Sequence, residues 1–347
     1  MDVSTNAPAD TATPAGPPPG IPLPMSTTIA PSDNSTSTIL TVRDTDPPIA
    51  PTEAGLTFRA GIPYGSRTMA DGSVRQLKLD IFTHAIDEGP KPLVVYVSGG
   101  GFMVSIKESA RLQRTYVAEA GFVVASIDYT ALTHGEGATF NDGVADVRSA
   151  IRFLRANAAE FGIDPARIAV WGESAGGYFA AMAGATSGTH EFDAGDNPTV
   201  SSDVQAVVDN FGASSLAHVA EDFDEAAKAF WTGSDSPLAK YVFGPAGGVL
   251  DPANETLIKA NPVTYVNAAT PPFLLFHGDV DNLVSPSQTL RLHKALRGAG
   301  ASSERYVLAG GGHGDLTFIG DPEGGRAWLT TKVVDIIVDF LRTNLAA

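Results

Sequence analysis

The chain has 347 residues, no cysteine, and 23 Lys and Arg against 39 Asp and Glu, which gives a net charge of −16. The absence of cysteine excludes a disulfide scaffold, a cysteine nucleophile and a metal site built on thiolates. The negative charge argues against nucleic acid or an anionic membrane surface as the main partner, and no apolar run reaches the ~18 residues that a membrane span needs.

Residues 1–51 differ in composition from the rest of the chain. They are dominated by Pro, Thr, Ser, Ala and Asp, and they contain almost no aromatic or periodic apolar residues. Such a stretch buries too little surface to offset the entropy lost on ordering, so we expect a flexible arm over residues 1–51. The alternative is that Ile21 to Met25 and Ile39 to Val42 lie across the surface of the domain. The first residues have no basic region followed by an apolar region, so no intact secretory signal is expected there.

Residues 52–347 alternate between short apolar runs and segments with helical spacing, and Gly162 has the position of a helix C-cap. This alternation predicts an α/β domain with a mostly parallel central sheet and helices on both faces. Ligands of such sheets bind beyond the carboxyl ends of the strands. The predicted strands are Gln76–Phe82, Leu93–Val97, Phe122–Ile127, Ile168–Trp171, Val204–Asp209, Phe273–Phe276 and Arg305–Leu308, and the predicted helices are Asn141–Phe161, Ser174–Ala185 and Val333–Leu345.

Residues 214–266 interrupt the alternation. They carry clustered acidic residues, scattered aromatic residues and two glycine-containing turns. A long insertion between sheet elements is often a lid, so we expect a cap over about residues 214–266. The alternative is a surface segment without a functional role.

A nucleophile motif follows one predicted strand directly. Gly172-Glu173-Ser174-Ala175-Gly176 comes after Ile168–Trp171 and opens a helix, which is the context of a nucleophile elbow. Such an elbow exposes the serine hydroxyl at the strand end and aims the next amide, that of Ala175, at a developing oxyanion. The alternative is a tight strand-to-helix turn without chemistry.

A second glycine-rich loop follows the strand Leu93–Val97. Its sequence is Ser98-Gly99-Gly100-Gly101-Phe102, and three glycines at a strand end leave backbone amides free to donate to a ligand. Because it lies upstream of the serine elbow, we interpret it as the other half of an oxyanion hole. A phosphate-binding loop is disfavoured, because no Gly-Lys-Ser/Thr sequence is present.

A general base must come from the seven histidines. His313 lies in a glycine-rich loop after a late strand, which is a poor core position and a good catalytic one, whereas His277 is interpreted as a turn or site-lining residue. The orienting acid should lie between serine and histidine in the chain, and the residues alone leave Asp279 and Asp281 equally suited. Ser174 would then attack an acyl carbon while His313 takes its proton, and this chemistry needs no metal and no organic cofactor.

The order of these motifs resembles the α/β-hydrolase superfamily, and most of all its carboxylesterase branch, which includes hormone-sensitive-lipase-like esterases and bacterial feruloyl and acetylxylan esterases. The resemblance covers about Leu77 to Leu345. In the pattern His-Gly-x-x-Asp-x-x-Val it implies Asp281 as the catalytic acid, and it implies the amides of Gly100, Gly101 and Ala175 as oxyanion donors. This chain departs from the family at Ser98, where the family usually has histidine. Glu173 before the serine is more typical of the feruloyl-esterase-like branch.

Together these features predict a serine carboxylic ester hydrolase whose partner is a small-molecule ester with a small or aromatic acyl or alkyl group. Candidate substrate-binding residues are Phe102, Met103, Glu173, Phe230 and Trp231. A peptidase or amidase of the same fold is the second hypothesis, and a non-catalytic binding protein is the third. An acidic, cysteine-free chain with a Pro/Thr/Ser-rich arm also suits a bacterial secreted enzyme.

Overall fold

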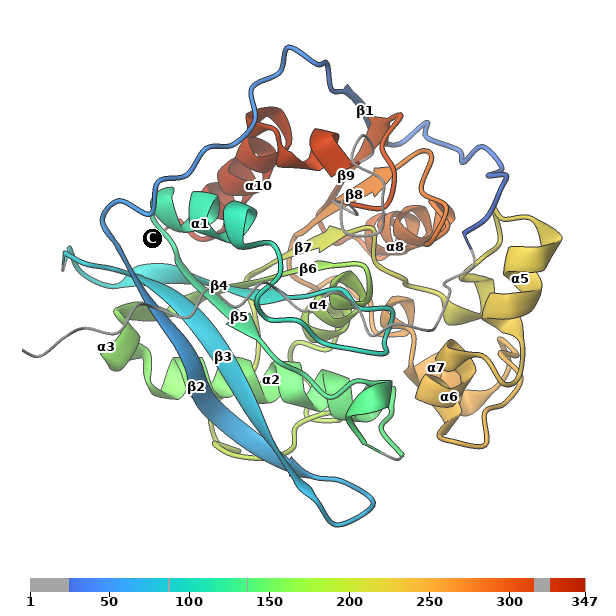
Figure 1. The fold of residues 1–347 in the computed structure, drawn as a ribbon, viewed down its shortest axis with the longest axis horizontal. Coiled ribbons are helices and arrows are strands. Elements are labelled where there is room, and N and C mark those ends of the chain that lie inside the picture. The colour runs from blue at the N-terminus through green and yellow to red at the C-terminus, as the bar shows by residue number, and fades with distance from the viewer. Residues whose placement is uncertain (1–24, 87, 136, 315–324, 347) are drawn as a thin grey trace, which may run out of the picture.

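The computed structural model describes residues 25–86, 88–135, 137–314 and 325–346. These residues form a nine-stranded sheet in the order β1-β9-β8-β7-β6-β4-β5-β3-β2 (Figure 1). β3 pairs antiparallel with β2 and with β5, and the other neighbours are parallel. The strands are β1 (Thr38–Thr41), β2 (Leu56–Thr68), β3 (Val74–His84), β4 (Lys91–Val97), β5 (Val123–Ile127), β6 (Ile163–Glu173), β7 (Ala206–Asn210), β8 (Phe273–Gly278) and β9 (Ser303–Ala309).

Helices cover both faces of the sheet, as the alternation of strands and helices predicted. α2, α4 and α8 contribute to the core on one face, and α1 and α10 pack side by side on the other (Figure 1). Successive residues of β4 enter opposite cores, which explains why this strand has no polar face. The α-helices are α1 (Arg111–Glu119), α2 (Phe140–Ala156), α3 (Ala158–Phe161), α4 (Ala175–Ala185), α5 (Glu225–Thr232), α6 (Pro237–Phe243), α7 (Glu255–Lys259), α8 (Ser287–Gly298) and α10 (Thr331–Asn344).

The N-terminal segment corrects the predicted boundary of the flexible arm. β1 pairs in parallel with β9 from Thr38 opposite Tyr306 onward, and Ile49 is buried. Further upstream, Ile29 forms a β-bridge with Phe223. Leu40 and Val42 pack against the core, which agrees with the alternative that residues 39–42 lie across the surface of the domain. Residues 25–51 therefore belong to the folded domain, and residues 1–24 lie outside the described residues.

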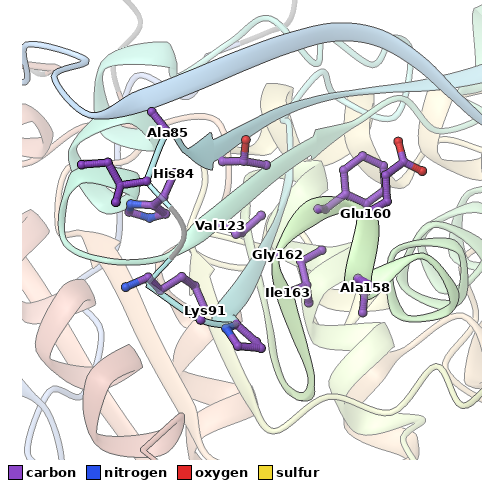
Figure 2. A pocket seen from close by; sticks show the side chains of 14 residues that line it. His84, Ala85, Lys91, Val123, Ala158, Glu160, Gly162 and Ile163 are labelled. Atoms are coloured by element: carbon purple, nitrogen blue, oxygen red, sulfur yellow. The ribbon is translucent and has the colours of Figure 1, made fainter.

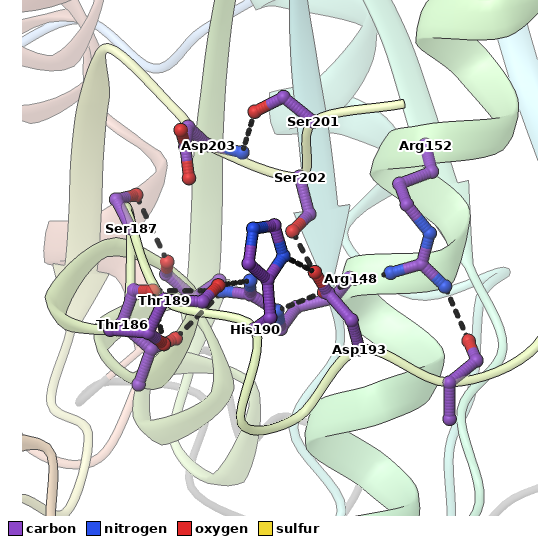
Figure 3. Close-up of polar contacts among 12 residues, drawn as sticks. Arg148, Arg152, Thr186, Ser187, Thr189, His190, Asp193, Ser201, Ser202 and Asp203 are labelled. Atoms are coloured by element: carbon purple, nitrogen blue, oxygen red, sulfur yellow. Dashed lines mark hydrogen bonds and ion pairs between the residues drawn. The ribbon is translucent and has the colours of Figure 1, made fainter. Parts of the chain in front are cut away.

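A buried cluster of arginines fixes the chain that follows α4. Arg148 and Arg152 of α2 both donate to Asp193 Oδ1, at 2.7 and 2.9 Å (Figure 3). His190 Nδ1 lies 2.8 Å from Asp193 Oδ2. Burial alone would raise the pKa of Asp193, but the hydrogen bonds from Arg148 and His190 outweigh it and lower the pKa to about 2. The network ties α2 to the loop after α4, the helix that begins at Ser174.

Residues 214–266 lie between β7 and β8 and contain three short helices, α5, α6 and α7. Each helix starts at a side chain that accepts backbone amides, namely Asp224, Ser236 and Asn254. In Figure 1 these helices lie together at the right of the view, and their buried side chains join the core on the α2 and α4 side of the sheet. Their action as a cap stays a prediction.

Candidate functional site

Ser174 occupies a strained turn between β6 and α4. Its backbone has φ 56° and ψ −121°, outside the ordinary regions for a residue with a side chain. A Cβ added at Gly172 would lie 2.0 Å from the carbonyl oxygen of Gly176, and one added at Gly176 would lie 2.0 Å from that of Val97. The turn can therefore close only with glycine at both positions. This is the nucleophile-elbow geometry that the sequence predicted.

The predicted serine, histidine and acid lie together in a continuous hydrogen-bonded chain. His313 Nε2 is 2.8 Å from Ser174 Oγ, and His313 Nδ1 is 2.7 Å from Asp281 Oδ2. The histidine ring packs against Phe211, with ring centroids 4.7 Å apart. Sequence reasoning did not single out Phe211, although its place just after a strand was a signal for it. The arrangement has the geometry of a nucleophile, a base and an orienting acid.

Asp281 is fully buried and its carboxylate is saturated with donors. Its Oδ1 accepts the amides of Leu283 and Val284, each at 2.9 Å. Burial would raise the pKa of Asp281, but the contacts of its carboxylate with His313 and His277 outweigh burial and hold the pKa far below its usual range. Asp281 is thus ionised when it meets His313.

Asp279, the other acid that the residues alone left open, lies elsewhere. It is exposed, and its Oδ1 accepts the amide of Gly310 at 2.6 Å. This bond holds the start of the loop that carries His313. Among the described residues, no hydrogen bond or ion pair joins Asp279 to His313.

The glycine-rich loop after β4 lies against the serine. A Cβ added at Gly99 would be 3.1 Å from Ser174 Cβ, and one at Gly100 would be 2.1 Å from the carbonyl oxygen of Val104. Gly100 and Gly101 have φ of 151° and 61°. In the described part of the chain, neither of their amides donates to a backbone or side-chain acceptor. They remain available to a bound oxyanion.

Ser98 supports this loop. Its side chain is fully buried, and Ser98 Oγ accepts the amide of Ile106 at 2.9 Å. Tyr129 Oη donates to the Ser98 carbonyl oxygen at 3.0 Å and to that of Val104 at 3.2 Å. A hydroxyl at position 98 and the tyrosine thus shape the loop at the position where the resembling family usually has histidine.

The candidate substrate-binding residues are not brought together. Phe102 is only 7% exposed, and its ring stacks on Tyr241 at a centroid distance of 5.4 Å, so it belongs to the core. Met103 is half-buried in the same loop, where its carbonyl oxygen accepts from Thr133. Phe230 and Trp231 pack on each other in α5, and across the described ranges no hydrogen bond or ring contact connects either to the serine, histidine and acid.

Glu173 is half-buried beside the nucleophile, where Tyr96 Oη donates to its Oε2 at 3.0 Å. The side-chain Nδ2 of Asn210 lies 3.4 Å from Glu173 Oε1. The backbone carbonyl oxygen of Asn210 accepts the backbone amide of Ser174 at 2.9 Å. Glu173 therefore helps to fix the turn that carries the serine. Its contact with substrate stays a prediction.

A surface hollow of about 490 Å³ lies away from this site (Figure 2). Its lining includes Lys91 and Ile163, the first residues of β4 and β6, whereas Ser174 follows the last residue of β6. The hollow therefore lies at the amino ends of the parallel strands, whereas Ser174 lies at their carboxyl ends. Within the described ranges, no group of three or more His, Asp or Glu side chains could hold a metal ion, and none of the helices there is long and apolar enough to cross a membrane.

Comparison with known proteins identifies relatives over most of the chain. A family model described as BD-FAE matches residues 79–296. An isoprenylcysteine alpha-carbonyl methylesterase of Arabidopsis thaliana is 28% identical over 275 residues, which cover 78% of this chain and 61% of the relative. The chain spans about three fifths of the length of the curated relatives it matches first.

Solved structures agree with this comparison. A truncated carbohydrate esterase from gut microbiota is similar with a TM-score of 0.71 at 25% identity, over 86% of this chain and 99% of that one. The apo form of Thermogutta terrifontis esterase 2 is similar with a TM-score of 0.63 at 26% identity, over 86% of this chain and 98% of that one. That esterase has also been solved phosphorylated by paraoxon. The comparisons confirm the predicted resemblance to esterases with the α/β-hydrolase fold.

Proposed function

The chain belongs to the BD-FAE family of α/β-hydrolases, and from this we propose that it is a serine carboxylic ester hydrolase that works through an acyl-enzyme on Ser174. The observation that carries the proposal is the continuous chain from Ser174 Oγ through His313 to Asp281, with donor-to-acceptor distances of 2.8 and 2.7 Å. Its members come from three separate loops, which follow β6, β8 and β9.

In the proposed reaction His313 Nε2 takes the hydroxyl proton as Ser174 Oγ attacks the ester carbonyl carbon. Asp281 holds the Nδ1–H tautomer and stabilises the imidazolium. The amides of Gly100, Gly101 and Ala175 donate to the oxyanion, and one such donor is worth about 3–4 kcal/mol. The imidazolium then protonates the leaving alcohol as the C–O bond breaks. Water, deprotonated by His313, releases the acid from the serine.

We assign small or aromatic acyl or alkyl esters as substrates. The relatives include proteins named as a methylesterase and as a carbohydrate esterase, both of which act on esters. The loop that lies against Ser174 has no charged side chain from Ser98 to Met103, which favours an uncharged group near the serine. A peptidase or amidase would use the same three residues and is the competing hypothesis.

The test is turnover of p-nitrophenyl acetate and butyrate by the wild-type chain and by Ser174→Ala. We expect wild-type turnover and a loss of at least about 1000-fold in the variant. Paraoxon should add one diethylphosphoryl group to Ser174, detected by peptide mass, and none to the variant. Matched p-nitroanilides separate the hypotheses, because faster anilide than ester cleavage would favour an amidase. Absence of wild-type ester turnover, or full activity of Ser174→Ala, would reject the proposal.

A further inference from the structure

A second chain of polar contacts reaches Asp281 through His277. Arg305 Nε lies 3.0 Å from Thr289 Oγ1, and Thr289 Oγ1 lies 2.9 Å from His277 Nδ1. His277 Nε2 then lies between two acceptors, 3.0 Å from the carbonyl oxygen of Val284 and 3.2 Å from Asp281 Oδ2, the same oxygen that meets His313. The four residues come from β9, α8, β8 and the loop after β8.

The chemistry of its two ends gives this chain a single direction. Arg305 can only donate, so Thr289 Oγ1 accepts from it. At the other end His277 Nε2 faces two acceptors, the Val284 carbonyl oxygen and the Asp281 carboxylate, so Nδ1 is the nitrogen that accepts from the Thr289 hydroxyl. With Nδ1 accepting, the ring proton of a neutral His277 sits on Nε2. The Nε2–H thus faces ionised Asp281, which can only accept, as well as the carbonyl oxygen of Val284. Thr289 therefore stabilises the tautomer of His277 that presents an N–H to the acid.

Burial makes this direction matter. The side chains of His277, Thr289 and Asp281 are fully buried, and Arg305 is 2% exposed. Burial lowers the pKa of Arg305 to about 10, so the guanidinium is still a cation at neutral pH. In such a setting a lone pair of His277 facing the carboxylate would repel it, whereas an N–H stabilises it.

The donors around Asp281 show what the second histidine adds. Leu283 and Val284 supply two amides to Oδ1, while His313 and His277 share Oδ2. Among the described residues, loss of His277 would leave His313 as the one side chain in contact with that oxygen.

We propose that His277, Thr289 and Arg305 are positioning residues for the hydrolysis, and that they act as a relay that fixes the rotamer and charge of Asp281. The inference rests on the proposed serine esterase function. It predicts that breaking the relay at Thr289, which is on α8 rather than in the serine–histidine–acid set, slows the chemical step and leaves substrate binding intact.

The experiment compares Thr289→Val, which has nearly the same shape but no hydroxyl, with Thr289→Ser, which keeps it. For p-nitrophenyl butyrate we expect Thr289→Val to lower kcat about tenfold with KM changed less than about twofold. The size is that seen when a hydrogen-bond partner behind a metal-binding residue is removed. Paraoxon labelling of Ser174 should slow by a similar factor, and Thr289→Ser should restore both rates to within about twofold of wild type.

Ser303→Ala is the matched control. His293 is a second buried histidine, on α8, and Ser303 Oγ lies 2.8 Å from its Nδ1. No described contact joins this pair to Asp281. The control should keep wild-type kcat. If Thr289→Val does not fold, the pair His277→Gln and His277→Leu decides, because the glutamine amide can donate to Asp281 and should be faster than leucine by at least about fivefold.

Three results would overturn the relay: wild-type kcat in Thr289→Val, a Thr289→Ser variant as slow as Thr289→Val, or equal rates for the two His277 variants. Each presupposes an active wild-type chain. A wild-type chain that neither turns over esters nor reacts with paraoxon would instead reject the proposed function, so the two failures are distinguishable.

Discussion

His313 Nε2 lies 2.8 Å from Ser174 Oγ although 139 positions separate the two residues in the chain. The sheet explains this proximity. β6, β7, β8 and β9 are consecutive parallel neighbours, so the loops that follow them all lie at the carboxyl ends of the strands, on the same side of the molecule. Ser174 follows β6, Phe211 follows β7, Asp281 follows β8 and His313 follows β9. The site is therefore made by four adjacent strand ends.

The two acids of the loop after β8 provide a matched pair of variants. Asp281→Asn should lower kcat by about 1000-fold or more, because the neutral amide neither holds the required tautomer of His313 nor stabilises the imidazolium. Asp279→Asn should stay within a few-fold of wild type, since Asp279 is exposed and accepts only the Gly310 amide among its described contacts. The measurement is steady-state ester hydrolysis, and equal losses in the two variants would contradict the assignment of the acid.

A glycine pair tests the loop that supplies oxyanion donors. Gly100→Ala places a Cβ 2.1 Å from the carbonyl oxygen of Val104, so the loop must move and kcat should fall by about 100-fold, roughly the value of one lost donor. Gly121 also has positive φ, at 108°, but a Cβ there meets nothing within 4 Å. Gly121→Ala therefore shares the backbone strain without the clash and should keep wild-type kcat. If both variants lose the same activity, the loss comes from general destabilisation.

The central strands could be predicted from the sequence because burial on both faces leaves a continuous apolar run, as in β4 and β5. β2 was missed because Gly61, Pro63 and Gly65 interrupt its pattern, and its register with β3 shifts at those residues. β1 was missed for a different reason, since it is an edge strand of four residues of which only Leu40 is partly buried, so it has no apolar alternation to read.

The nucleophile and base could be predicted because each follows a recognisable strand in a glycine-rich loop. The choice of Asp281 over Asp279 came from the family resemblance, and the structure agrees with it through the 2.7 Å contact to His313. The relation of His277 to Asp281 depends on Thr289 and Arg305, which lie on other elements. No local pattern encodes that coincidence, so it could be seen only in three dimensions.

Residues 25–49 should contribute to stability. Arg305 Nη1 donates to Asn34 Oδ1 at 2.9 Å and to Ser37 Oγ at 2.8 Å, and the segment also buries Ile49. A chain that begins at residue 50 should melt at least about 5 °C below one that begins at residue 25, because a buried cation loses two acceptors and β9 loses a neighbour. Thermal unfolding followed by circular dichroism measures this. Equal melting temperatures would show that the segment adds no stability, as expected of the flexible arm predicted from composition.

Asp209 of β7 should make the folded state less stable as pH rises, whereas an acid in an ion pair makes the folded state more stable as pH rises. Its carboxyl is fully buried with Oδ1 accepting the Gly212 amide at 2.8 Å, and burial, opposed only by that bond, raises its pKa from 3.8 to about 7. Between those two values the unfolded chain is ionised at this position while the folded chain stays protonated. The folded state then binds more protons, so its stability falls as pH rises from about 4 to about 7 and is flat above that range.

Asp209→Asn removes this titration while keeping the oxygen that accepts from Gly212. The free energy of unfolding of wild type minus that of the variant should therefore decrease from pH 4.5 to pH 8, by an amount on the order of a few kcal/mol. Urea unfolding of both proteins at the two pH values measures the difference, and the other titrating groups cancel in it. A difference that does not change with pH would show that Asp209 is ionised in the folded chain throughout that range.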